Sequence, residues 1–155
     1  INLLKETLKN DENNSNIYAD LGYLYSLAKD FENAKSNLQR AIELNDNNSY
    51  ALNNLAWLYC ENHVQLEDAV AFAQKACELE PNNDNFLDTL AEAYYQTNQY
   101  EKAIEIIKKA IDINPNYDYL HEQLEKIKKA AGQNTATDDS DNDEVNTERG
   151  TSDGE

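Results

Sequence analysis

Apolar residues recur along this chain at helical spacing, and the pattern itself recurs every 34 or 35 residues. Equivalent positions are Tyr25, Tyr59 and Tyr94, and likewise Ala34, Ala69 and Ala103. The one extra residue falls between Tyr59 and Ala69, within the polar stretch 61–65. A fixed period that changes in length only within a turn indicates a repeat array, in which each unit packs mainly on its neighbours.

The apolar stripes predict eight helices joined by short polar turns. Asp30 can cap the helix that follows it by accepting a hydrogen bond from a free backbone N–H group. Pro81 and Pro115 end helices because proline cannot continue one, and Gly132 is a residue type that commonly stops one. The predicted helices are 1–9, 16–28, 31–44, 49–61, 66–79, 84–97, 100–113 and 116–131.

Gly22 lies inside one of these predicted helices, where it costs about 1 kcal/mol relative to alanine. Ala56 and Ala91 take the equivalent place one and two repeats later, and they are also small. We therefore expect a neighbouring helix to approach closely at this position.

Three copies of one motif resemble the tetratricopeptide repeat. The copies are Tyr18, Leu21, Gly22, Tyr25, Ala34, Leu38 and Ala41; Leu52, Leu55, Ala56, Tyr59, Ala69, Ala73, Ala76 and Pro81; and Leu87, Leu90, Ala91, Tyr94, Ala103, Ile107, Ala110 and Pro115. Two departures are mild, since Asp46 replaces the expected proline and Ala73 a usual aromatic residue. The resemblance implies an all-α, right-handed superhelical solenoid of antiparallel helix pairs, whose concave face binds peptides or proteins and has no catalytic activity.

The repeat pattern divides the chain into six segments. These are residues 1–14, the second helix of a truncated repeat; 15–48, 49–83 and 84–117, three repeats; 118–132, a C-terminal capping helix; and 133–155, an acidic disordered tail. The capping helix carries Leu120, Leu124 and Ile127 on one face and is otherwise polar, as a terminal repeat requires. Because the chain begins at Ile1 in mid-pattern, we expect a fragment or processed form of a longer protein.

The net charge of −17 disfavours nucleic acid and anionic membranes as partners, because both attract clustered Lys and Arg. The sequence contains no apolar run long enough for a membrane-spanning helix. Cys60 and Cys77 are expected to be packing or groove residues, because two cysteines do not form a disulfide framework.

Candidate catalytic and metal sites are lacking in the sequence. His63 and His121 have no Cys or His neighbours at metal-ligand spacing, and no nucleophile motif or glycine-rich phosphate loop is present. The sequence therefore predicts no enzyme activity, no metal site and no cofactor.

A second stripe on the first helix of each pair is the candidate binding surface, and the resemblance places it in the concave groove. Its predicted partner-binding residues are Tyr23, Leu27, Tyr50, Asn53, Asn54, Trp57, Glu61, Asn85, Asp88, Glu92, Tyr95 and Tyr119. The aromatic residues of this stripe provide large contact areas at low entropic cost. Its other charged residues are acids, against a single base, Lys126, so we expect a basic or apolar-basic peptide as the partner. The tyrosines fit equally well a packing role against adjacent helices, with no ligand.

Some tetratricopeptide domains clamp the C-terminal carboxylates of heat-shock chaperones with Lys, Asn and Arg. The matching positions here are Ala19, Tyr23, Asn54, Asn85 and Thr89. Only Asn54 fits, so the resemblance does not extend to that co-chaperone role.

Three functions remain open at this point. The first is a protein-protein interaction scaffold, within a larger polypeptide or assembly whose repeats look like those of bacteria. The second is a regulatory or recruiting arm of an enzyme whose catalytic domain lies elsewhere. The third is a self-assembling structural protein that stacks through an N-terminal apolar edge formed by Leu4 and Leu8. The compartment is not indicated beyond a slight preference for the cytoplasm.

Overall fold

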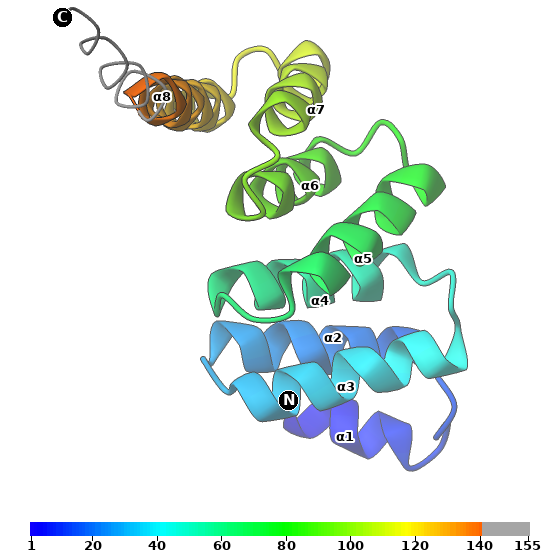
Figure 1. Cartoon of the computed structure of the whole chain (residues 1–155). Helices are drawn as coiled ribbons and strands as arrows, with labels where there is room; N and C mark the ends of the chain where they lie inside the picture. Colours follow the sequence, from blue (N-terminus) through cyan, green and yellow to red (C-terminus); the bar gives the residue numbers. More distant parts are fainter. Residues whose placement is uncertain (141–155) are drawn as a thin grey trace, which may run out of the picture.

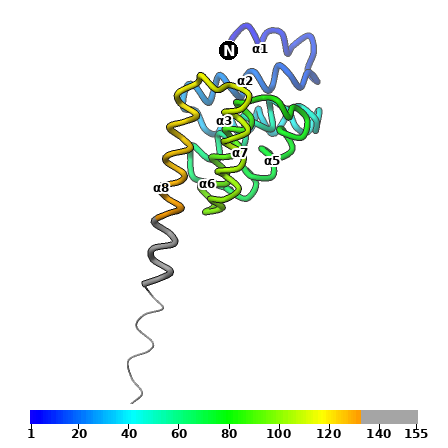
Figure 2. Tube along the Cα trace, turned by 90° about the horizontal axis from the view of Figure 1, so that it is seen from above, coloured from blue at the N-terminus to red at the C-terminus, as the bar shows by residue number. Residues whose placement is uncertain are grey.

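The computed structural model describes the backbone of residues 1–140 and the side chains of residues 1–132. Within that part the chain is all-α and has no strand. The helices are α1 (Asn2–Leu8), α2 (Ser15–Leu27), α3 (Phe31–Leu44), α4 (Ser49–Glu61), α5 (Leu66–Leu79), α6 (Asp84–Gln96), α7 (Tyr100–Ile113) and α8 (Asp118–Ser140). Consecutive helices form antiparallel pairs that stack into an elongated solenoid, with α1 and α8 at its two ends (Figure 1). Viewed from above, α8 runs across the direction of α1 and α2, so the stack twists along its length (Figure 2).

The predicted bounds of α3, α4, α5 and α7 agree with the structure to the residue. Asparagine caps explain why the first helix of each repeat begins where it does: the side chains of Asn14, Asn48 and Asn83 each accept a backbone N–H of their own helix. The predicted cap of α3 is confirmed, because Asp30 Oδ1 accepts from the Asn33 N–H at 3.3 Å.

Helix α8 does not end at Gly132, so that part of the prediction is wrong. A glycine ends a helix where the glycine itself adopts a left-handed conformation, and Gly132 does not adopt a left-handed φ. Its cost is only the propensity difference of about 1 kcal/mol, which the helix tolerates. The remainder of the predicted acidic tail, residues 141–155, lies outside the described residues.

Each repeat turns from its first to its second helix through a residue with positive φ. These residues are Lys29 (58°), His63 (53°) and Asn98 (58°), at equivalent positions of the three repeats. The extra residue of the second repeat adds another left-handed residue, Gln65 (47°), directly before α5. The irregularity in the repeat period is thus absorbed in the turn.

The core is a ribbon of small and branched side chains that continues from α2 to α8. At Gly22 a Cβ atom would lie 2.4 Å from Leu38 Cγ and 3.2 Å from the Ala34 carbonyl oxygen, which confirms the expected close approach. The neighbour is α3, the second helix of the same repeat.

The two ends of the array differ in how they pack. Helix α8 lies against α7 and buries Leu120 and Ile127, with Leu124 half-buried. Helix α1 packs on α2 and buries none of its residues, although Leu4 and Leu8 are half-buried.

Candidate interaction groove

Four residues at equivalent positions form a line across the first helices of successive repeats. They are Tyr23 on α2, Trp57 on α4, Glu92 on α6 and Lys126 on α8, each 34 or 35 residues after the one before. Because α4 packs against both α2 and α6, these residues follow one another along one face of the array. We call this line the groove stripe. It is apolar at its N-terminal half and charged at its C-terminal half.

The N-terminal half of the groove stripe lines a cleft of about 130 Å³ between α2 and α4. The apolar side chains of the cleft are exposed: Tyr23 by 49%, Leu27 by 60% and Trp57 by 37%. Asn54, Glu61, Ser26 and Lys29 provide the polar part of its lining. The cleft therefore brings together five of the predicted groove residues, namely Tyr23, Leu27, Asn54, Trp57 and Glu61.

Lys29 is a cleft residue that the sequence did not predict. Its ammonium pairs with the Glu61 carboxylate across the rim. The same two residues border a second hollow of about 230 Å³ with Phe31, Leu58 and Asn62. Lys126 is thus not the only base at the groove. The sequence signal that could have pointed to Lys29 is its place four residues after Tyr25, the same place that His63 and Asn98 take after Tyr59 and Tyr94.

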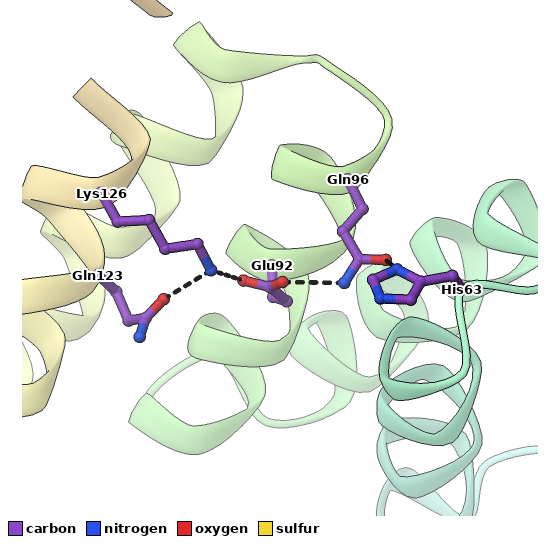
Figure 3. Close-up of polar contacts among 5 residues, drawn as sticks. All are labelled: His63, Glu92, Gln96, Gln123 and Lys126. Atoms are coloured by element: carbon purple, nitrogen blue, oxygen red, sulfur yellow. Dashed lines mark hydrogen bonds and ion pairs between the residues drawn. The ribbon is translucent and has the colours of Figure 1, made fainter. Parts of the chain in front are cut away.

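The C-terminal half of the groove stripe is held together by charge. Lys126 Nζ lies 2.7 Å from Glu92 Oε2, 3.1 Å from Gln123 Oε1 and 4.4 Å from the centre of the Tyr95 ring. The other Glu92 oxygen accepts from Gln96 Nε2 at 2.9 Å, and Gln96 Oε1 lies 3.1 Å from His63 Nδ1 (Figure 3). One polar chain thus connects the α4–α5 turn with α6 and α8.

Asp88 and Tyr119 adjoin this cluster, one turn of helix from Glu92 and Gln123 respectively. The Tyr119 hydroxyl is close enough to the Asp88 carboxylate for each to affect the pKa of the other. Burial, with the nearby Glu92 carboxylate, raises the pKa of Asp88 to about 6. Burial and the Asp88 carboxylate raise the pKa of Tyr119 to about 12.

The remaining predicted groove residues lie elsewhere. Tyr50 is exposed, with the edge of its ring against Phe86 at 5.4 Å between centroids. Asn85 is exposed beside a shallow hollow formed by residues 80–85, at the start of α6. Asn53 is only 8% exposed, and its Oδ1 atom has no hydrogen-bond partner. Because α4 is flanked by α2 and α6, Asn53 lies beneath the groove surface, with little area for a ligand.

The described side chains contain no group of three or more His, Cys, Asp or Glu residues that could hold a metal ion. Burial raises the pKa of the Cys60 thiol to about 12, which keeps it protonated and unreactive. No helix in the described part of the chain is both long and apolar enough to cross a membrane.

Family models match most of the repeat region. A tetratricopeptide repeat model matches residues 15–48, a second one residues 37–71, and the model of anaphase-promoting complex, cyclosome, subunit 3 residues 62–131. The chain is a tetratricopeptide repeat protein. Among curated protein sequences, none matches it.

Several solved structures share this fold at low identity. MamA is 22% identical with a TM-score of 0.73, over 83% of this chain and 75% of that one. The first tetratricopeptide domain of Spaghetti (RPAP3), bound to an HSP90 peptide, is 16% identical with a TM-score of 0.72, over 79% of this chain and 96% of that one. A mutant O-GlcNAc transferase of Thermobaculum terrenum is 19% identical with a TM-score of 0.69, over 73% of this chain but only 22% of the transferase chain. These likenesses concern the fold.

Proposed function

We propose that this tetratricopeptide protein recruits a partner by binding an extended or short helical segment of it in the groove. An apolar residue of the partner enters the cleft of Tyr23, Leu27 and Trp57. The exposure of these three neighbouring apolar side chains carries the proposal, since contiguous exposed apolar surface marks interaction sites and aromatic residues dominate binding energy.

The charge of the groove favours a basic partner segment. Three carboxylates, those of Glu61, Asp88 and Glu92, lie along it, and Lys29 and Lys126 pair with two of them. The groove therefore holds one more carboxylate than ammonium groups, and the chain as a whole carries a net charge of −17. The Spaghetti domain, in contrast, was solved with an HSP90 peptide. Of the five positions that match a carboxylate clamp, only Asn54 has a fitting residue, so the same ligand is not expected here.

A peptide array that varies charge around one apolar residue tests this proposal, followed by titration of the intrinsic fluorescence of Trp57, the single tryptophan. We expect apolar-basic peptides to be selected and to change this fluorescence. The Trp57→Ala variant should lose about 2 kcal/mol or more of binding free energy, as expected for a hot spot. The fluorescence anisotropy of a labelled peptide measures this loss.

Leu79→Ala is the matched control, because Leu79 has a similar exposure of 40% but lies at the end of α5, outside the groove. It should bind like the parent protein. Selection of acidic peptides, or binding that survives Trp57→Ala, would contradict the proposal.

The likeness to the transferase favours a second role, as the recruiting arm of an enzyme, because this chain spans 22% of that protein. Finding a catalytic domain in the same polypeptide would support this role, and finding only further repeats would refute it. Self-association through Leu4 and Leu8 also stays a prediction, which light scattering of the protein at increasing concentration tests.

A further inference from the structure

The Lys126 ammonium occupies a site built from an acid, an aromatic ring and an amide. Glu92 accepts its hydrogen bond at 2.7 Å, and Gln123 accepts a second one at 3.1 Å (Figure 3). The centre of the Tyr95 ring lies 4.4 Å from the ammonium nitrogen. We call these three residues the ammonium cage. A carboxylate and the face of an aromatic ring are two features that attract an alkylammonium ion.

Lys126 can leave this cage at low cost. Its side chain is 39% exposed, so water can solvate the ammonium ion when it leaves. The Glu92 side chain is only 18% exposed and keeps the hydrogen bond from Gln96. The apolar residues Leu120 and Ile127, both buried, hold α8 in place. The lysine can therefore swing out without displacing the helix.

We propose that the ammonium cage receives a lysine side chain of the bound partner, and that Lys126 fills it until the partner displaces it. This inference rests on the proposed peptide-binding function and adds a specificity site to it. Lys126 is in this view an internal competitor, because the partner's lysine offers the same chemical group. Glu92 and Tyr95 determine which residue the partner presents.

The spacing of the groove stripe sets where this lysine lies. Trp57 and Glu92 are on α4 and α6, which pack against each other. Packed helices are about 8–10 Å apart, and an extended chain advances about 3.3–3.6 Å per residue. The partner's lysine should therefore be about three residues from its apolar anchor.

A small amine tests the cage without any peptide. In Lys126→Ala, n-butylammonium chloride should shift the ¹H–¹⁵N resonances of Glu92 and Tyr95 saturably, whereas n-butanol with sodium chloride at equal ionic strength should not. Binding to the parent protein should be about three- to fivefold weaker, the factor by which an exposed ion pair of this kind competes.

Lys128→Ala is the matched control, since Lys128 pairs with Glu125 on the same helix outside the cage. It should behave like the parent. Glu92→Gln in the Lys126→Ala background should remove amine binding, and melting curves establish that each variant is folded. Absence of saturable shifts in Lys126→Ala, or an equal affinity for the amine in Lys128→Ala, would overturn the cage.

The peptide arm uses an array-selected peptide with a lysine three residues from its apolar residue. Lys126→Ala should bind it about three- to fivefold more tightly than the parent, and replacing the peptide lysine by norleucine should remove this gain. The rate at which a reagent acetylates Lys126, measured by mass spectrometry, should increase when the peptide binds, because the displaced ammonium group is more accessible.

If peptides bind the cleft but Lys126→Ala leaves affinity unchanged or weakens it, the displacement by a partner lysine is refuted and the proposed function stands. If no peptide binds at all, the proposed function is refuted, and so is the binding of a partner lysine. The amine titration then still shows whether the cage binds an ammonium ion.

Discussion

At Gly22 the missing side chain makes room for Leu38 of the facing helix. The same pair of positions holds Ala56 and Ala73 in the second repeat, so the repeats fill this contact with different combinations of sizes. Gly22→Ala should lower the free energy of unfolding by about 1–2 kcal/mol, because a Cβ atom this close to Leu38 costs up to about 3 kcal/mol and the helix-propensity gain returns only about 1 kcal/mol.

The double variant Gly22→Ala, Leu38→Ala tests the cause, since it reproduces the alanine pair of the second repeat. Urea unfolding of both single variants and the double variant should show that the two costs are less than additive. Simple additivity would mean that Leu38 does not limit the space at Gly22.

Asp88 should make stability depend on pH. Its folded-state pKa of about 6 exceeds the usual value of 3.8, so the folded state binds the proton more tightly than the unfolded state. The stabilisation is present below about pH 4 and is lost as the pH rises through 6. Asp88→Asn should therefore be more stable than the parent at pH 7.5, by about 1–2 kcal/mol, and the difference should shrink towards pH 4.

Urea unfolding at several pH values measures this difference. Asp20→Asn is the control, because Asp20 is exposed on α2. A constant offset between Asp88→Asn and the parent across this pH range would contradict the assignment.

Among the helices, the sequence predicted bounds well where an apolar stripe meets an asparagine or aspartate cap, as at α3 and α4, or a following proline, as at α5 and α7. It predicted the end of α8 poorly, because a glycine ends a helix only where its own backbone becomes left-handed, which the residue type alone does not determine. It also placed Asn53 beside Trp57 in the groove, yet the structure buries the former and exposes the latter. Residues four apart differ by about 40° around a helix, which is enough to separate a groove residue from a buried one.

The docking of α8 should depend on its buried residues more than on Leu124. Ile127→Ala should cost about 2–5 kcal/mol of unfolding free energy, whereas Leu124→Ala should cost less, because Leu124 is only half-buried. Hydrogen exchange should increase most in α7, the neighbour of α8, since repeat arrays are stabilised by nearest-neighbour contacts. Equal increases in α2 and α7 would argue against α8 as a terminal cap.

The whole molecule carries 30 Asp and Glu residues against 13 Lys and Arg residues. Its negative electrostatic field therefore acts on approaching peptides before they make contact. The association rate of a basic peptide should fall as salt rises, because the Debye length shortens from about 30 Å at 0.01 M to about 8 Å at 0.15 M. Stopped-flow recording of Trp57 fluorescence measures this rate. Glu92→Lys should slow association at low salt, and a rate independent of salt would exclude electrostatic steering.

The residues of the left-handed turns make contacts between repeats, so we expect these contacts to affect how easily the array is stretched. Lys29 reaches Glu61, and His63 reaches Gln96, each in the following repeat. Bending between repeats stretches these peripheral contacts before it disturbs the alanine-rich core. A load on a bound partner would therefore change the pitch of the solenoid before any helix unfolds. In single-molecule pulling, we expect a soft extension ahead of the first unfolding step and a softer response in Lys29→Ala; an unchanged stiffness would show that the core alone sets the elasticity.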